Sequence, residues 1–301
     1  MKFLASTLMA IMTVCQVYGQ IKLSDFDLVK SFQSNQEKLK PAVISFTVPN
    51  KKESSLLINA ALGIDVAPLM FNENEQMITL VPYVEYNRNT MIDKEQNQLS
   101  SGLYLEWIIL SEKSKFMPAI TSTVKYSNDY VNKIESLQGE LFIAPKWTGK
   151  SPGIKNWYVP DNFVKTGKDD FFGFEYVPYF GLELDQRFRA KADSLKGNIT
   201  RFVFKIEPIL HFFPKVDESG KFQYYYVELN LGYQYRQVLF HNVKGIEWNS
   251  NYFCASLNYI ISQNDDTKTN LSIGLDYVNG PDPTKAFQDQ NYFGLSFKAK
   301  L

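Results

Sequence analysis

Apolar and polar side chains alternate with a period of two along much of this chain. In FFGFEYVPYFGLELDQRFRA (171–190), every second residue from Phe172 to Leu184 is apolar, aromatic or proline. The intervening positions carry most of the charge, including Glu175, Glu183 and Arg187. Successive side chains of a β-strand point to opposite faces, so this pattern predicts a strand with one apolar and one polar face.

The same alternation predicts twelve strands in total. Turn-forming clusters such as NKKES, SEKSK, DESGK and NGPDP lie between them. The predicted strands cover 41–49, 54–66, 76–88, 98–110, 116–127, 134–146, 171–190, 198–213, 224–237, 251–260, 271–277 and 291–301.

Two all-β architectures fit such a pattern: a water-soluble sandwich and a membrane barrel. The predicted strands are long compared with the usual strand of about 5–6 residues. Their apolar faces are rich in aromatic residues, as in barrels whose rings lie at the bilayer interfaces. We therefore predict a transmembrane, antiparallel, up-and-down β-barrel. Four prolines fall on the apolar faces inside strands, where a sheet tolerates proline poorly: Pro82, Pro118, Pro178 and Pro208.

Composition agrees with an exported barrel and excludes some functions. The chain has 301 residues, with 32 Lys+Arg and 32 Asp+Glu, so no basic excess indicates binding to nucleic acid. Aromatic residues make up 15% of the chain. Beyond the N-terminus there is no apolar run of the roughly 18 residues that a transmembrane helix needs.

The N-terminus resembles a secretory signal. Lys2 precedes an apolar stretch over 3–14, and Gly19 is a small residue of the kind found before a cleavage site. We expect a signal peptide over 1–19, a periplasmic segment over 20–40 and a barrel over 41–301. A membrane anchor, or a lipoprotein at Cys15, are the alternatives. Cleavage after Gly19 would leave Cys254 as the single cysteine, so no intramolecular disulfide could form.

The chain as a whole resembles bacterial outer-membrane β-barrel proteins. Such proteins usually end in an alternating strand that the barrel-assembly machinery recognises, and the corresponding residues here are Phe293, Leu295, Phe297 and Leu301. Gln20 lies directly after the predicted cleavage site, and in this the chain resembles exported proteins of the Bacteroidota. The resemblance implies location in the bacterial cell outer membrane, contact with its lipid, and an even number of strands. Twelve strands fit best, and ten to fourteen are compatible with the pattern.

The polar faces should line the lumen with charges of both signs. They could line a selective pore, or pair into a network that closes the lumen. The predicted lumenal set is Glu85, Glu106, Glu175, Glu183, Asp185, Arg187, Arg189, Arg201, Lys205, Glu207, Glu228 and Arg236.

A long Gly/Pro-containing connection over 147–170 follows the sixth predicted strand. It could fold inward as a plug through Trp157, Tyr158 and Phe163, or remain a surface loop. Residues 22–39 show the only suggestion of a helical period.

No catalytic constellation is visible. The two histidines, His211 and His241, have no serine or acidic partner in a recognisable motif, and no CxxC, HExxH or phosphate-binding loop occurs. We therefore expect no cofactor, no metal site and no enzyme activity. The leading expectation is a channel for small polar solutes. The alternative is a closed accessory barrel with an envelope partner protein, and a barrel-embedded hydrolase ranks last.

Overall fold

Twelve long strands dominate the computed structural model of the chain. It describes residues 26–33, 40–49, 54–70, 76–90, 95–109, 116–147, 164–166, 171–216, 222–264, 269–282 and 288–300. The long strands are β2 (Ala42–Pro49), β3 (Ser55–Ile64), β5 (Gln76–Asn89), β6 (Gln96–Ile109), β7 (Phe116–Asp129), β8 (Ile134–Trp147), β10 (Phe172–Arg189), β11 (Gly197–Val216), β12 (Phe222–His241), β13 (Asn249–Asn264), β14 (Thr269–Asp282) and β15 (Gln288–Lys300).

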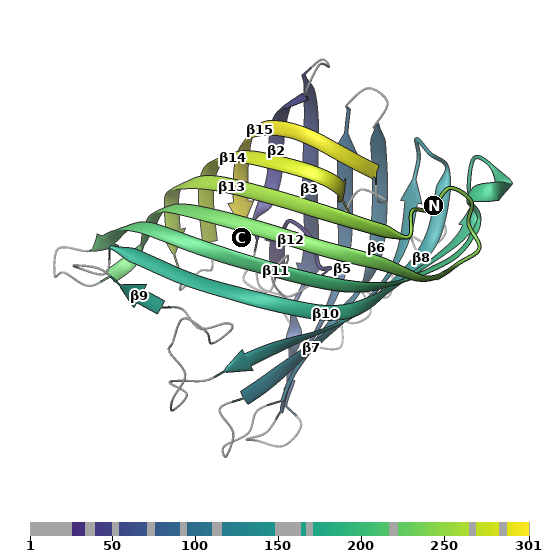
Figure 1. The fold of residues 1–301 in the computed structure, drawn as a ribbon. Coiled ribbons are helices and arrows are strands. Elements are labelled where there is room, and N and C mark those ends of the chain that lie inside the picture. The colour runs from purple at the N-terminus through teal and green to yellow at the C-terminus, as the bar shows by residue number, and fades with distance from the viewer. Residues whose placement is uncertain are drawn as a thin grey trace.

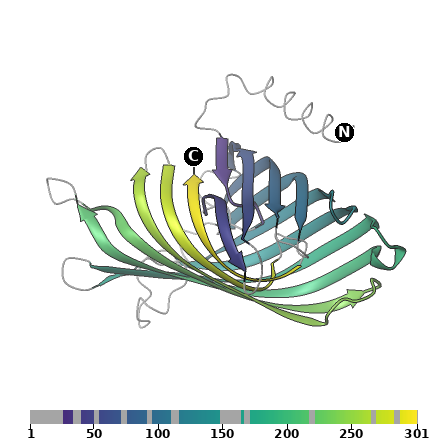
Figure 2. The ribbon, with the colours of Figure 1, turned by 90° about the horizontal axis from the view of Figure 1, so that it is seen from above.

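These twelve strands form one closed antiparallel barrel (Figures 1 and 2). Each pairs with the next along the chain. The ring closes where β15 meets β2, with Phe297 opposite Ile44. Closure gives each of the twelve strands a paired neighbour on both sides, and a closed ring of this kind is the form in which β-structure spans a bilayer. The predicted fold class and the predicted strand number are both confirmed.

The outer surface of the barrel is apolar, as the alternation predicts. Leu184 is 55% exposed and Leu275 is 61% exposed, while their neighbours along the strand point inward. Every barrel strand contributes at least one large exposed apolar side chain: Ile44, Leu62, Tyr86, Leu103, Val124, Leu141, Leu182, Phe213, Tyr233, Leu257, Leu275 and Phe293. An apolar surface that runs around a closed barrel is the surface that lipid covers.

Pro178 and Pro208 lie where a ladder is interrupted. The β10 ladder with β8 ends at Phe180 and its ladder with β9 (Val164–Thr166) ends at Phe174. Pro178 falls in the gap, so its missing N–H breaks no pair on that side. Pro208 likewise falls between the paired residues Ile206 and Ile209 of the β11–β12 ladder. At this end of the barrel β7 and β8 splay away from β10 (Figure 1).

The wall also contains a strand that the predicted division placed before the barrel. β1 (Phe26–Val29) pairs with β3, with Leu28 opposite Leu62. It extends the line of β2 along the same edge of β3. Residues 26–29 are thus part of the barrel wall rather than of a segment outside it. The predicted signal peptide lies outside the described residues.

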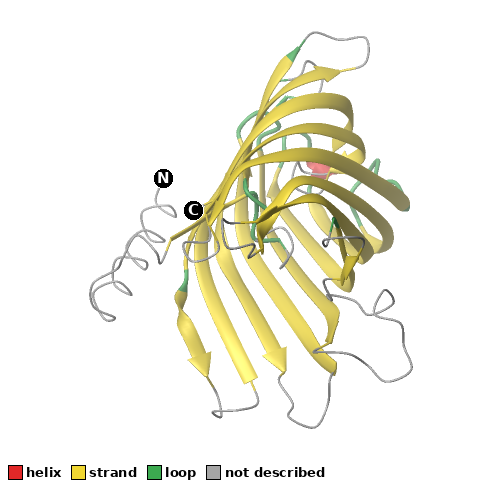
Figure 3. Cartoon of the chain, turned by 90° about the vertical axis from the view of Figure 1, so that its left-hand side faces the viewer, coloured by secondary structure: helices red, strands yellow, loops and turns green. Residues whose placement is uncertain are grey.

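Two small elements complete the described structure. β4 (Val66–Met70) pairs with β5 next to the end of β3, and a single 3-10 turn, η4 (Asp193–Leu195), joins β10 to β11 (Figure 3). Within the described residues, no helix is long and apolar enough to cross a membrane.

Candidate functional site

The lumen of the barrel carries the predicted charged residues. Glu85 and Glu207 are almost fully buried. They are buried because alternation turns them away from the apolar outer face. The same burial holds for Glu106, Glu183, Asp185, Arg187, Arg201, Lys205 and Arg236.

These charges form ion pairs within one strand or between strands that are separated by a third. Arg236 Nε donates to both carboxylate oxygens of Glu183 at 3.1 Å, and Arg236 Nη2 donates to Gln234 at 2.6 Å. Arg187 Nε donates to Asp185 at 2.8 Å. A buried charge without a partner is costly, so removing either member of such a pair leaves the other destabilising.

Arg189 departs from the predicted lumenal set. Its side chain is 74% exposed and forms an ion pair with Glu135 of β8 at 2.9 Å. The β8–β10 register shifts between Arg187 and Arg189, which marks a bulge. An extra residue in one strand turns the following side chains to the other face, so strict alternation fails here.

His211 lies between two of the predicted carboxylates. Its Nε2 atom is 3.7 Å from Glu175 and its Nδ1 atom is 3.5 Å from Glu228. Its ring also packs against Tyr225, with 5.4 Å between the centroids. Glu175 and Glu228 are only partly buried, so this group lies closer to solvent than the Glu183–Arg236 pair.

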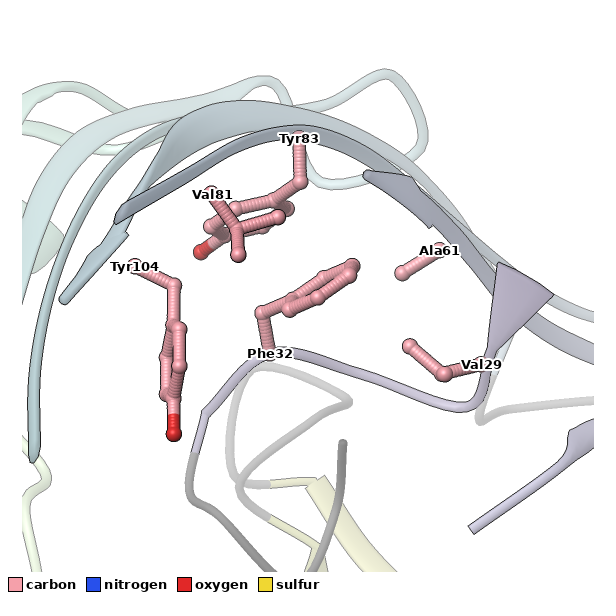
Figure 4. Close-up of a cluster of buried hydrophobic side chains, with 6 residues drawn as sticks. All are labelled: Val29, Phe32, Ala61, Val81, Tyr83 and Tyr104. Atoms are coloured by element: carbon pink, nitrogen blue, oxygen red, sulfur yellow. The ribbon is translucent and has the colours of Figure 1, made fainter. Parts of the chain in front are cut away.

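Part of the segment over 22–39, for which the sequence suggested a helical period, enters the lumen. After β1, residues 30–33 turn inward, and Phe32 is fully buried against Tyr83 and Tyr104 (Figure 4). Gly63 makes room for this ring, since a Cβ there would come within 2.5 Å of Phe32 Cζ. We call residues 30–33 together with Lys40 the inward segment.

Polar contacts fasten the inward segment to opposite parts of the wall. Ser31 Oγ donates to Glu85 of β5 at 2.8 Å, and Thr123 Oγ1 of β7 donates to the Phe32 carbonyl at 2.9 Å. Lys40 Nζ donates to Glu207 of β11 at 2.6 Å. The segment therefore bridges the lumen from the β5–β7 side to β11.

Trp157, Tyr158 and Phe163, the predicted plug residues, lie outside the described residues, so that expectation stays a prediction. The element that the structure does place inside the barrel comes from the N-terminal end. Its only sequence signal is the short alternation Phe26, Leu28 followed by Phe32. The suggestion of a helical period over 22–39 is wrong at 26–29, where the chain forms strand β1.

A second polar cluster lies on β13, β14 and β15. Lys298 Nζ donates to Asn258 Oδ1 at 2.6 Å, to Asp276 Oδ1 at 2.7 Å and to Ser256 Oγ. Ser256 Oγ in turn donates to Asp276 at 2.5 Å. A nucleophilic serine needs a neighbouring base that accepts its proton. Lys298 instead donates to three oxygens as an ammonium group, so it is placed as the partner of Asp276 and not as a base for Ser256.

Next to this cluster the lumen encloses a cavity of about 110 Å³. Its wall includes Lys40 of the inward segment, Asn59 of β3 and Cys254 of β13. Among the residues that the structure describes, no three His, Cys, Asp or Glu side chains are grouped so that they could hold a metal ion.

At the rim away from the C-terminus, two loops interlock. Asn242 Oδ1 accepts from the Asn198 backbone N–H at 2.7 Å, and Lys244 N donates to Ser194 O at 2.9 Å. Within the first loop, a hydrogen bond from Lys196 lowers the pKa of Asp193 below its usual value. Nδ1 of His241, the second histidine, lies 2.9 Å from the Val243 carbonyl and donates to it when it carries the proton.

The C-terminal strand has the surface that the resemblance requires. Phe293, Leu295 and Phe297 all point outward from β15 and are 65%, 54% and 47% exposed. Leu301 lies outside the described residues. Recognition of this strand by the assembly machinery stays a prediction, as does the likeness of Gln20 to exported proteins of the Bacteroidota.

Comparison with known proteins gives solved structures only. No family model matches the chain, and no curated protein matches it. It is similar to the β domain of the Bordetella autotransporter BrkA, at 8% identity and a TM-score of 0.44, over 91% of this chain and 97% of that one. It is also similar to the transport unit of the autotransporter AIDA-I from Escherichia coli, at 10% identity and a TM-score of 0.38, over 98% and 96%.

Likeness at this level supports no conclusion about activity. The chain's own geometry is more informative, because it combines a closed twelve-stranded antiparallel wall, an apolar outer surface on every strand and a charged lumen. These are the features of a barrel that spans a bilayer. The protein is a closed, twelve-stranded antiparallel β-barrel with the outer surface of a barrel that spans a membrane.

Proposed function

We propose that the barrel is a channel for small polar solutes in the bacterial outer membrane, and that the inward segment narrows its lumen. The observation that carries this proposal is the lumen itself. It is lined by polar and charged side chains, encloses a cavity, and is bridged by the inward segment rather than filled by an apolar core.

The inward segment has the attachment expected of a gate. One apolar side chain, Phe32, is seated between strands, and a few polar contacts hold its flanks. Such an attachment is weaker than the continuous ladders of the wall, so the segment can leave its seat while the barrel stays folded. Glu207, which accepts from Lys40, also pairs with Lys205 at 3.3 Å and would keep a partner after release.

The second candidate is a closed accessory barrel that binds another envelope protein. The paired charges favour it, because Glu183–Arg236 and Lys125–Glu85 are almost completely buried and could hold the lumen shut. Neither candidate includes a catalytic step, a cofactor or a metal. Both require contact with outer-membrane lipid and insertion by the barrel-assembly machinery.

Single-channel recording in a planar bilayer separates the two candidates. The mature chain from Gln20 is refolded in detergent and reconstituted beside a variant with Phe32→Ala and Lys40→Ala. A channel gives discrete conductance steps that become larger or more frequent in the variant. A folded barrel that is silent in both forms would exclude the channel and support the accessory role.

A further inference from the structure

The cavity in the lumen has a location of its own. It lies against the inner faces of six consecutive wall strands, β12–β15, β2 and β3, and Lys30 and Lys40 flank it. Its volume of about 110 Å³ exceeds what one water molecule occupies. The cavity is therefore large enough for a small organic solute.

Three asparagine side chains give this cavity its chemistry. Asn59 on β3, Asn230 on β12 and Asn270 on β14 line it, and Asn59 is only 4% exposed. The Oδ1 atom of each is buried and has no hydrogen-bond partner among the described residues. A buried acceptor without a donor is costly, so a partner in the cavity would stabilise all three. Each amide also carries donors, so a group that both donates and accepts satisfies it in either orientation.

The charges around the cavity disfavour an ionic solute. Lys298 and Asp276 neutralise one another at 2.7 Å, and Lys40 is engaged by Glu207 at 2.6 Å. Lysine side chains at the wall disfavour a cation. Unpartnered amide oxygens together with Glu228 disfavour an anion. A neutral solute avoids both the repulsion of a cation by the lysines and the repulsion of an anion by the oxygens.

One wall of the cavity is apolar. Tyr252, Val278 and Tyr292 pack with Val43 and Leu57 into a buried cluster on this side. A ligand that fits should therefore present hydroxyl groups on one side and carbon–hydrogen surface on the other.

We propose that this cavity binds a small neutral polyol, such as a tetritol or a monosaccharide. Hydroxyl groups donate to and accept from the three asparagine amides, and the carbon skeleton packs on the tyrosine side. The inference rests on the proposed channel function, because it names the class of solute that the channel would pass.

Saturation-transfer NMR on the refolded mature barrel tests the proposal. Erythritol and glucose are the probes, and acetate and ethylammonium are the ionic controls. We expect a signal from at least one polyol and none from either ion. Asn59→Ala and Asn270→Ser should each weaken polyol binding by about tenfold. Asn87→Ala is the matched control, because Asn87 is also a buried lumenal asparagine but does not line the cavity.

A second readout does not depend on the variants folding. Cys254 lines the cavity and is the only cysteine of the chain from Gln20. A bound polyol should slow its reaction with a neutral methanethiosulfonate reagent, whereas acetate should not.

The outcomes separate this inference from the channel. Polyol binding in a barrel that never conducts would support the cavity and refute the channel. Conductance without a polyol signal or thiol protection would refute the cavity and leave the channel standing. Equal polyol binding by the wild type, Asn59→Ala and Asn270→Ser would also overturn the assignment of the site.

Discussion

Gly63→Ala tests whether Phe32 is the seat of the inward segment. The added Cβ would lie 2.5 Å from Phe32 Cζ and 2.5 Å from Val81 Cγ1. Carbon atoms prefer separations of about 3.5–4.0 Å, so both contacts overlap by about 1 Å. Phe32 is fully buried and its centroid is 4.8 Å from that of Tyr83, so the ring has little room to move aside.

The expected cost follows from these overlaps. Overpacking a dense site costs about 1–3 kcal/mol, and replacing glycine by alanine recovers up to about 1 kcal/mol through the unfolded chain. A net cost of about 1–2 kcal/mol would lower the ratio of seated to released inward segment by about 5- to 30-fold. Single-channel open probability measures that shift, and urea unfolding in detergent reports any loss in the barrel itself.

Gly139→Ala is the matched control. A Cβ at Gly139 would meet its nearest atom at 3.8 Å, which is ordinary contact, so this variant should behave like the wild type. In a Phe32→Ala background, Gly63→Ala should cost less, because one of its two overlaps is gone. The reasoning fails if Gly63→Ala matches Gly139→Ala in both open probability and stability, or if its cost is unchanged without the Phe32 ring.

Three further predictions concern the charges and the rim. Glu183→Leu should lower the free energy of unfolding by about 3–5 kcal/mol, because it leaves Arg236 buried without its 3.1 Å partner. Arg189→Ala removes an arginine whose side chain is 74% exposed, so it should cost at most about 1 kcal/mol in the same urea titration. Equal effects of the two variants would contradict the buried network. Lys40→Met should raise open probability, because it removes the 2.6 Å contact to Glu207, and unchanged gating would exclude that contact as a latch. Asn242→Ala should speed amide hydrogen exchange at Asn198, because it removes the 2.7 Å bond from the Asn198 N–H to Asn242 Oδ1, while exchange at Leu182 in the wall stays slow. No change at Asn198 would show that the rim loops do not depend on this bond.

Local pattern was sufficient for the wall of the barrel. The predicted strand over 76–88 is observed as β5 (Gln76–Asn89), and that over 134–146 as β8 (Ile134–Trp147). Strand geometry repeats every two residues, so the order of apolar and polar residues decides which side chains face lipid. Eleven of the twelve predicted lumenal charges are buried or partly buried. The exception, Arg189, follows a β-bulge, and the alternation of residue types does not reveal a bulge.

The contacts inside the lumen could be learned only from the tertiary structure. Lys40 and Glu207 are 167 residues apart in the sequence, and Ser31 and Glu85 are 54 apart. No periodicity joins such residues, because they meet only after the barrel has closed. The cavity depends on the same closure, since Asn59 of β3 and the pair Asn230 and Asn270 of β12 and β14 lie on opposite sides of the seam where β15 meets β2. The sequence by itself determined the strands, their two faces and the membrane-spanning class. Closure of the ring and the inward turn after β1 decided what the lumen contains, because both are set by contacts between distant parts of the chain.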